Sequence, residues 1–207
     1  MPENPSTQPA AVPSGAVAPA EQRSLAAPVI LRAVVALAFG AVTVFWGTPT
    51  AAGAAWCLAA YFVGLAAARA WLLREEGRAA DPAARPTAAV RLVSSACFGL
   101  AAAVGLGLGA APGGGVIAAG GAAALALTGL ADLVAAIVGR GRSPLARDEV
   151  IIGAVHLGAA VLLPFVAGLG AHALLGVAGG AAIITGVLLL IGGLSLRHDS
   201  AAQPDVA

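Results

Sequence analysis

The chain has 207 residues, of which 59% are hydrophobic and 10% charged, and its mean hydropathy is +0.92. A water-soluble domain of this composition would have too few polar side chains to cover its surface, so the composition indicates a membrane protein. The net charge of +1 gives no basis for nucleic-acid binding. Cys57 and Cys97 lie in apolar runs, where their spacing forms neither a disulfide framework nor a CxxC metal site.

Residues 1–27 are rich in proline, alanine and serine and are expected to form a disordered cytoplasmic tail. Prolines interrupt every apolar stretch in this segment, so it lacks the continuous core of a secretory signal peptide. We therefore expect the first membrane helix to be an uncleaved anchor.

Six apolar segments follow, and each is long enough to cross roughly 30 Å of hydrocarbon as a helix. They lack the alternating pattern of barrel strands, so the predicted fold class is all-α, a polytopic membrane protein with six transmembrane helices. The membrane domain is predicted to cover residues 28–194, and residues 195–207 form a C-terminal cytoplasmic tail. The predicted helices are residues 28–46, 50–73, 88–108, 114–138, 150–169 and 171–194.

Arginines separate the connections between these helices into two kinds. The connections after the first, third and fifth helices carry no arginine or acidic residue, whereas those after the second and fourth helices are arginine-rich. Arg23 and Arg197 lie near the two ends of the chain. Because basic loops remain in the cytoplasm, both termini and both basic loops are predicted to be cytoplasmic.

The first, third and fifth helices carry a recurring pattern. RAVVALAFG ends at Gly40, RLVSSACFG ends at Gly99, and a weaker copy, VIIGAVHLG, ends at Gly158, with 59 residues between successive glycines. The second helices of each pair align through Gly64, Gly129 and Gly186. The pattern predicts three tandem helical hairpins, about residues 28–73, 88–138 and 150–194, repeated in the same orientation.

These segments resemble the HdeD-like membrane proteins, a bacterial short-repeat family associated with acid resistance. The resemblance is carried by RAVVALAFG, RLVSSACFG, the AYFVGLAA-type second helices and the total of six spans. The third repeat departs from it, with Val150 in place of the arginine and Leu157 before Gly158. The resemblance implies a six-span inner-membrane fold and a role in acid or envelope stress, and it supplies no catalytic or ligand-binding residues.

Small residues lie four positions before each glycine of the first helices. The pairs are Ala36 with Gly40, Ser95 with Gly99, and Ala154 with Gly158. Such pairs share one helix face and allow membrane helices to approach closely. Together with the second-helix glycines, they predict helix packing within the chain or, alternatively, an interface with another copy or another membrane protein.

Arg32 and Arg91 lie about one turn inside the predicted cytoplasmic ends of their helices. Long side chains at this depth reach the lipid headgroups, so both arginines are predicted to anchor the membrane interface. Contact with an anionic lipid or a substrate is the alternative.

Asp132 is the strongest candidate for an intramembrane polar site, because it lies about 12 Å inside the helix end at Arg140. A carboxylate at that depth needs a partner, a water-filled cavity or a proton. Arg69 and Arg91 approach from the same side and are the predicted partners. The contact either fixes the helix register or belongs to a proton or ion relay.

His156, in the fifth helix, is expected to be packed neutral or hydrogen-bonded across helices, with proton sensing as the alternative, shared with His172. No nucleotide-binding, metalloprotease or nucleophile-elbow motif occurs in the sequence, so no catalytic residue, metal or cofactor is predicted. We expect a non-enzymatic, HdeD-like inner-membrane protein whose partners are membrane lipids, with copies of itself or other membrane proteins as further candidates. A small channel or transporter for protons or small solutes, built on Asp132 and neighbouring arginines, is the alternative.

Overall fold

The computed structural model describes residues 19–80, 82, 85–141, 143 and 145–202. These residues form an all-helical structure whose elements are α1 (Pro19–Phe45), α2 (Ala51–Glu76), α3 (Ala88–Ala110), α4 (Gly114–Val138), α5 (Ala146–Leu162), the 3-10 helix η2 (Leu163–Leu169) and α6 (Ala171–Ala202). No strand occurs among the described residues. Six of the helical segments are long and apolar enough to cross a membrane, as predicted.

Local sequence signals set several of these helix boundaries. Thr50 caps α2 by accepting a hydrogen bond from the Gly53 amide at 3.0 Å, and Thr87 caps α3 by accepting from Val90 at 3.3 Å. A threonine hydroxyl at this position satisfies an amide that has no partner within the helix. Pro164 lacks an N–H, and α5 gives way to η2 at this proline.

Several predicted helix boundaries differ from the observed ones. The first helix begins at Pro19 and continues through Pro28, so residues 19–27 of the predicted tail are helical. Residues 1–18 of that tail lie outside the described residues. Membrane helices tolerate such a proline because neighbouring groups compensate for the missing hydrogen bond. The sixth helix continues to Ala202, through most of the predicted C-terminal tail. The fifth α-helix begins earlier than predicted, at Ala146, and residues 163–169 are a 3-10 helix.

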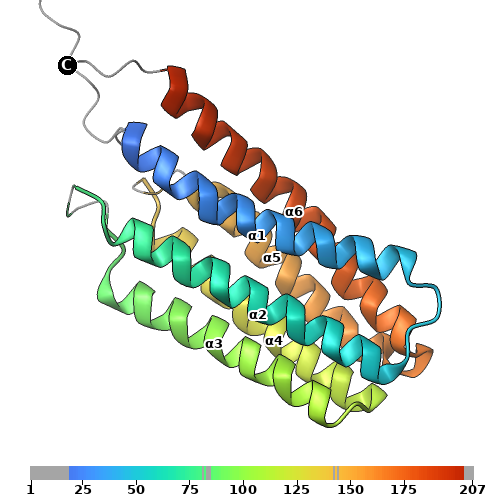
Figure 1. Ribbon diagram of the computed structural model, residues 1–207. Helices are drawn as coiled ribbons and strands as arrows, with labels where there is room; N and C mark the ends of the chain where they lie inside the picture. Colours follow the sequence, from blue (N-terminus) through green and yellow to red (C-terminus); the bar gives the residue numbers. More distant parts are fainter. Residues whose placement is uncertain (1–18, 81, 83–84, 142, 144, 203–207) are drawn as a thin grey trace, which may run out of the picture.

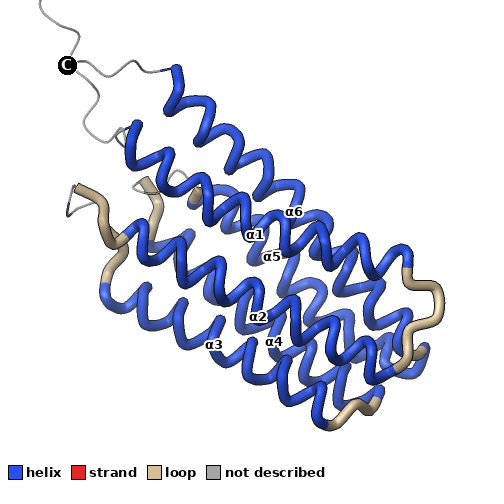
Figure 2. The backbone as a smooth tube through the Cα atoms, in the orientation of Figure 1, coloured by secondary structure: helices blue, strands red, loops and turns tan. Residues whose placement is uncertain are grey.

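The helices form a bundle in which each packs on the next along the chain and α6 packs extensively on α1 (Figures 1 and 2). Contacts also join α2, α4 and α6 to one another, which places these three helices on the inside of the bundle. The described ends of the chain lie at the same end of the bundle as the connections from α2 to α3 and from α4 to α5 (Figure 1). We call this the arginine-rich end and the other the opposite end.

Close backbone approaches join α4 to α5 and α1 to α6. A methyl group on Gly153 would lie 2.7 Å from the Gly129 carbonyl oxygen, and a methyl group on Gly129 would lie 2.8 Å from the Gly153 carbonyl oxygen. A methyl group on Gly40 would meet the Ile183 side chain and would lie 3.2 Å from the Gly179 carbonyl oxygen. At Gly129 and Gly153 the added methyl group would meet a backbone oxygen, so glycine at these positions brings the backbones of α4 and α5 together, and at Gly40 the approach to α6 is also tight.

Packing within the chain, one of the two roles predicted for the recurring glycines, is found for some of them and not for others. Gly64 and Gly186 face the side chains of Val35 and Leu37 on α1 at 2.7 and 2.8 Å from an added methyl group. Gly99 and Gly158, by contrast, are exposed and have open space where a side chain would be. Their partners in the predicted motif, Ser95 and Ala154, are also exposed.

The fifth helix has its packed glycine in a different register from the one that the 59-residue spacing predicted. Residues 31–40 and 151–160 have the same order of buried, half-buried and exposed positions, and so do residues 51–60 and 171–180. In this register Gly40 corresponds to Ala160, not to Gly158. The closely packed glycine of α5 is Gly153, which the glycine spacing did not single out.

Candidate functional site

A buried ion pair joins α1 to α4 inside the bundle. The Arg32 guanidinium donates two hydrogen bonds to the Asp132 carboxylate, from Nη1 to Oδ1 at 3.0 Å and from Nη2 to Oδ2 at 2.6 Å. The side chain of Arg32 is 3% exposed and that of Asp132 is fully buried. This two-pronged geometry uses the planar guanidinium to match both carboxylate oxygens and holds the two helices in one register.

A second buried pair joins α2 to α5. Arg69 donates from Nη1 to Oε1 of Glu149 at 2.7 Å, and from Nη2 to the Ser94 hydroxyl of α3 at 3.3 Å. Both partners of this ion pair are buried, with side-chain exposures of 2% and 7%. Arg69 therefore connects α2 to α5 by an ion pair and to α3 by a hydrogen bond.

The Phe98 ring of α3 connects the two pairs. The guanidinium carbon of Arg32 lies 5.2 Å from the ring centroid, and that of Arg69 lies 5.9 Å from it. An aromatic face stabilises a cation electrostatically, and more strongly where water is excluded. Phe98 thus replaces part of the hydration that both arginines give up inside the bundle.

His156 of α5 lies between Asp132 and Tyr61. Its Nδ1 is 3.6 Å from Oδ2 of Asp132, and its Nε2 is 3.2 Å from the Tyr61 hydroxyl of α2. In the neutral tautomer protonated at Nδ1, the ring directs its N–H toward the carboxylate and accepts a hydrogen bond from the tyrosine. At 3.6 Å the contact between the ring and the carboxylate is longer than a hydrogen bond, so it is electrostatic.

We call these side chains the buried ionic network, and their charges balance within it, because two guanidiniums face two carboxylates. Three of its nitrogen atoms have no hydrogen-bond partner among the described residues: Nε of Arg32, Nε of Arg69 and Nδ1 of His156. Ionisable groups inside a membrane bundle are costly unless paired, and they mark functional or architectural sites. The members of the network are Arg32, Tyr61, Arg69, Ser94, Phe98, Asp132, Glu149 and His156.

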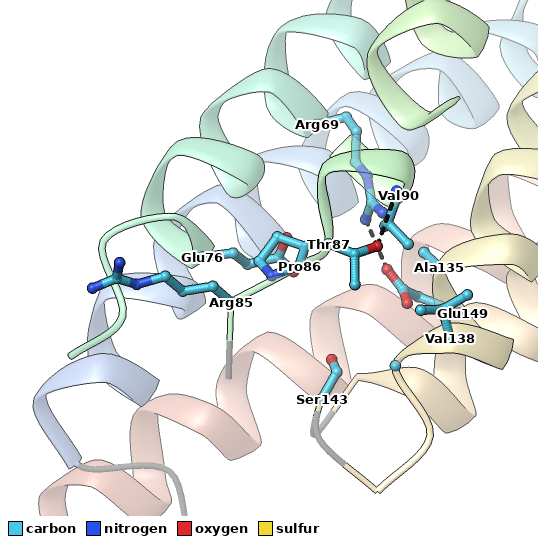
Figure 3. A pocket seen from close by; sticks show the side chains of 11 residues that line it. Arg69, Glu76, Arg85, Pro86, Thr87, Val90, Ala135, Val138, Ser143 and Glu149 are labelled. Atoms are coloured by element: carbon cyan, nitrogen blue, oxygen red, sulfur yellow. Dashed lines mark hydrogen bonds and ion pairs between the residues drawn. The ribbon is translucent and has the colours of Figure 1, made fainter. Parts of the chain in front are cut away.

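A small pocket reaches the network from the arginine-rich end (Figure 3). Its volume is about 50 Å³, which is room for one or a few water molecules. Arg69 and Glu149 line its inner part, and Glu76, Arg85 and Ser143 are among its other lining residues. The lining does not include Arg32, Asp132 or His156.

An apolar layer separates the network from the opposite end of the bundle. Phe39 stacks on Tyr61 with ring centroids 4.3 Å apart, and it belongs to a core of buried apolar side chains from the helices around it. Further members of this layer, each fully buried, are Leu58, Ile117, Leu163, Leu174 and Leu175. Tyr61, whose ring stacks on Phe39, also hydrogen-bonds Thr185 of α6, so the polar contacts of the described residues extend to that helix.

The structure corrects two of the sequence-based assignments of arginines. Arg32 was expected to anchor the membrane interface and is instead buried against Asp132. Arg69 and Arg91 were expected to pair with Asp132, but Arg69 pairs with Glu149, and Arg91 is exposed. An inter-helix arginine contact to Asp132 exists, as predicted, and it joins the first predicted hairpin to the second.

His156 makes a hydrogen bond across helices, one of the two arrangements expected for it, whereas His172 is exposed at the start of α6. Sequence reasoning missed Glu149, Tyr61, Ser94 and Phe98. Glu149 had a usable signal, because it lies seven residues before His156 and therefore on the same helical face.

The described residues contain no group of three or more histidine, cysteine or acidic side chains arranged to hold a metal ion. The free cysteines Cys57 and Cys97 are half-buried on different helices. The chain matches no family model, no curated protein and no solved structure in the three comparisons made with known proteins.

Proposed function

We propose that this chain is a non-enzymatic integral membrane protein of the HdeD-like kind that contributes to acid or envelope stress tolerance. Six helices able to cross a membrane support the membrane assignment. The proposal places it in a bacterial inner membrane with both termini in the cytoplasm, because arginines are concentrated in the connections at the end where the described chain ends lie.

One observation favours this proposal over a transport function. The four buried charges form two ion pairs, which join α1 to α4 and α2 to α5. A conduction path needs groups that contact water and exchange partners. Arg32 and Asp132 instead hold each other by two hydrogen bonds, outside the lining of the pocket. A paired buried network of this kind is suited to specifying one helix arrangement.

The apolar layer supplies the link to acid tolerance. It places Phe39, Leu58 and their neighbours between the ion pairs and the end of the bundle that would face the external medium. Protons from that side would have to pass these buried apolar side chains, which is costly. In this proposal the bundle keeps its internal ion pairs when the outside becomes acidic.

The test is survival after acid and envelope challenge in cells that lack this protein, complemented with the wild type or with Asp132→Asn. Wild type should restore survival, and Asp132→Asn should restore less of it at equal protein level in the membrane. Equal survival of cells with and without the protein under both challenges would refute the stress role.

A proton pathway is the second candidate, and the pocket favours it. Water in the pocket would contact Arg69 and Glu149, and the Phe98 ring links Arg69 to Arg32 and its partner Asp132. Purified protein in liposomes should then dissipate an imposed pH gradient, and Asp132→Asn should abolish the flux. Flux no higher than in empty liposomes would favour the architectural role.

A further inference from the structure

A second site lies on the surface of the arginine-rich end, away from the buried ionic network. Described residues that follow α4 and the first turns of α5 line a groove of about 530 Å³ that is open to the surroundings. Arg140, Ser143 and Arg147 supply its polar groups, and Val150 and Ile151 supply its apolar wall. Among the described residues, the lining contains two cationic side chains and no carboxylate.

The positive charge of this groove is not neutralised by the neighbouring acidic residues. Arg140 and Arg147 are exposed and make no hydrogen bond or ion pair with any described residue. The two carboxylates in the first turn of α5 face elsewhere: Glu149 binds Arg69 inside the bundle, and Asp148 lines a separate groove against α6. The groove therefore presents two free guanidiniums, the donors that best match a phosphate group.

The groove continues directly onto the lipid-facing side of α5. Arg147, Ile151, Ala154 and Gly158 follow one another at helical spacing on a single face, and all four are exposed. Ile151 is 43% exposed, and an added methyl group on Gly158 would meet nothing within 4 Å. The result is a shallow apolar strip whose small residues make no close contact within the chain.

The dimensions of the strip fit a lipid tail. Arg147 and Gly158 are separated along the helix axis by about 16 Å at 1.5 Å per residue. This is close to half of the roughly 30 Å hydrocarbon thickness of a bilayer, which is the depth of one leaflet. A free phosphate would account for the two arginines but not for the apolar strip that continues from them.

We propose that this groove and strip bind an anionic phospholipid. The phosphate lies between Arg140 and Arg147 and accepts a hydrogen bond from the Ser143 hydroxyl. One acyl chain lies along Ile151, Ala154 and Gly158. The site is independent of the buried ionic network and goes beyond the proposed function.

The test uses the full-length protein in neutral detergent, titrated with phosphatidylglycerol or phosphatidylcholine, with retained lipid counted by native mass spectrometry. The variant Arg140→Gln/Arg147→Gln should weaken retention of phosphatidylglycerol at least about tenfold, since each basic side chain near an anionic headgroup contributes about 1 kcal/mol. The matched control is Arg74→Gln/Arg197→Gln, which removes two exposed arginines at the same end and leaves the groove intact. Equal loss in both double variants would overturn the proposal, because it would reduce the effect to net charge.

A second variant separates a lipid from a free anion. Ala154→Phe fills the strip on an exposed face, so it should weaken phosphatidylglycerol retention while thermal stability stays unchanged. Inorganic phosphate should compete poorly with the lipid. Unaltered retention in Ala154→Phe together with full displacement by inorganic phosphate would identify an anion site alone, and equal retention of phosphatidylcholine would also overturn the assignment.

Discussion

Replacing Asp132 by asparagine isolates the contribution of the central ion pair. The two side chains have nearly the same shape, so the change opens no cavity at this fully buried position. It removes the negative charge facing Arg32 and places an amide nitrogen where one carboxylate oxygen accepted a guanidinium hydrogen bond, at 3.0 or 2.6 Å. The variant therefore leaves a positive charge uncompensated inside the bundle.

The expected cost is large for a single isosteric substitution. Removing one partner of a buried ion pair destabilises a protein by about 3–5 kcal/mol, because the remaining charge keeps its desolvation penalty. His156 lies 3.6 Å from the same carboxylate and cannot compensate, since its own protonation would add a second positive charge. The nearby Phe98 ring supplies only a weaker attraction to Arg32.

The assay is the free energy of unfolding in mixed micelles, measured by titration with a denaturing detergent. Asp132→Asn should lower it by about 3 kcal/mol or more, and the neutral pair Arg32→Gln/Asp132→Asn should recover a substantial part of that loss. Asp199→Asn is the matched control, because the Asp199 side chain is 65% exposed, and it should change stability by less than about 0.5 kcal/mol. If Asp132→Asn lowered the free energy of unfolding by no more than Asp199→Asn does, the reasoning that the ion pair holds α1 against α4 would be refuted.

Three further predictions concern the other contacts. Gly153→Ala should destabilise the bundle by about 1–3 kcal/mol, because the new methyl group would meet a backbone oxygen at 2.7 Å. The control Gly158→Ala should leave the free energy of unfolding unchanged. Equal effects of the two substitutions would show that the α4–α5 approach is not tight. Glu149→Gln should destabilise the bundle by about 3 kcal/mol or more, because Arg69 loses its ionic partner. It should also loosen α5, which is measured as faster hydrogen exchange in the first turns of that helix. Unchanged hydrogen exchange would contradict this prediction. Tyr61→Phe should cost about 1 kcal/mol in the same unfolding assay, since it removes the hydrogen bond to the histidine and keeps the stacked ring; a loss above about 3 kcal/mol would indicate a larger role for the hydroxyl.

The sequence alone predicted the class of the protein well. Long apolar runs must be helical in a membrane, because helices satisfy their backbone hydrogen bonds internally. That single constraint led to six helices, and the fourth was placed with the bounds observed, residues 114–138. The arginine-rich connections were also recognised from the sequence, and they lie together at one end of the bundle (Figure 1).

The candidate site was only partly predictable. Asp132 stood out because a carboxylate deep in an apolar run has few acceptable environments, and the need for an arginine partner followed from that. The choice of Arg32 did not follow. Its position one turn inside the predicted helix end suits a headgroup contact equally well, and α1 begins at Pro19, nine residues before the predicted start, which places Arg32 deeper in the helix.

Tertiary structure decided which side chains meet. Arg32 and Asp132 are 100 residues apart in the chain, and Arg69 and Glu149 are 80 apart, so their pairing depends on the packing of α1, α2, α4 and α5 in one bundle. Helical periodicity shows which residues share a face, but not which face turns inward when every face is apolar. For that reason the hydropathy of the segments determined the helices, whereas the close approach of particular backbones, such as that at Gly129 and Gly153, decided the faces that became buried.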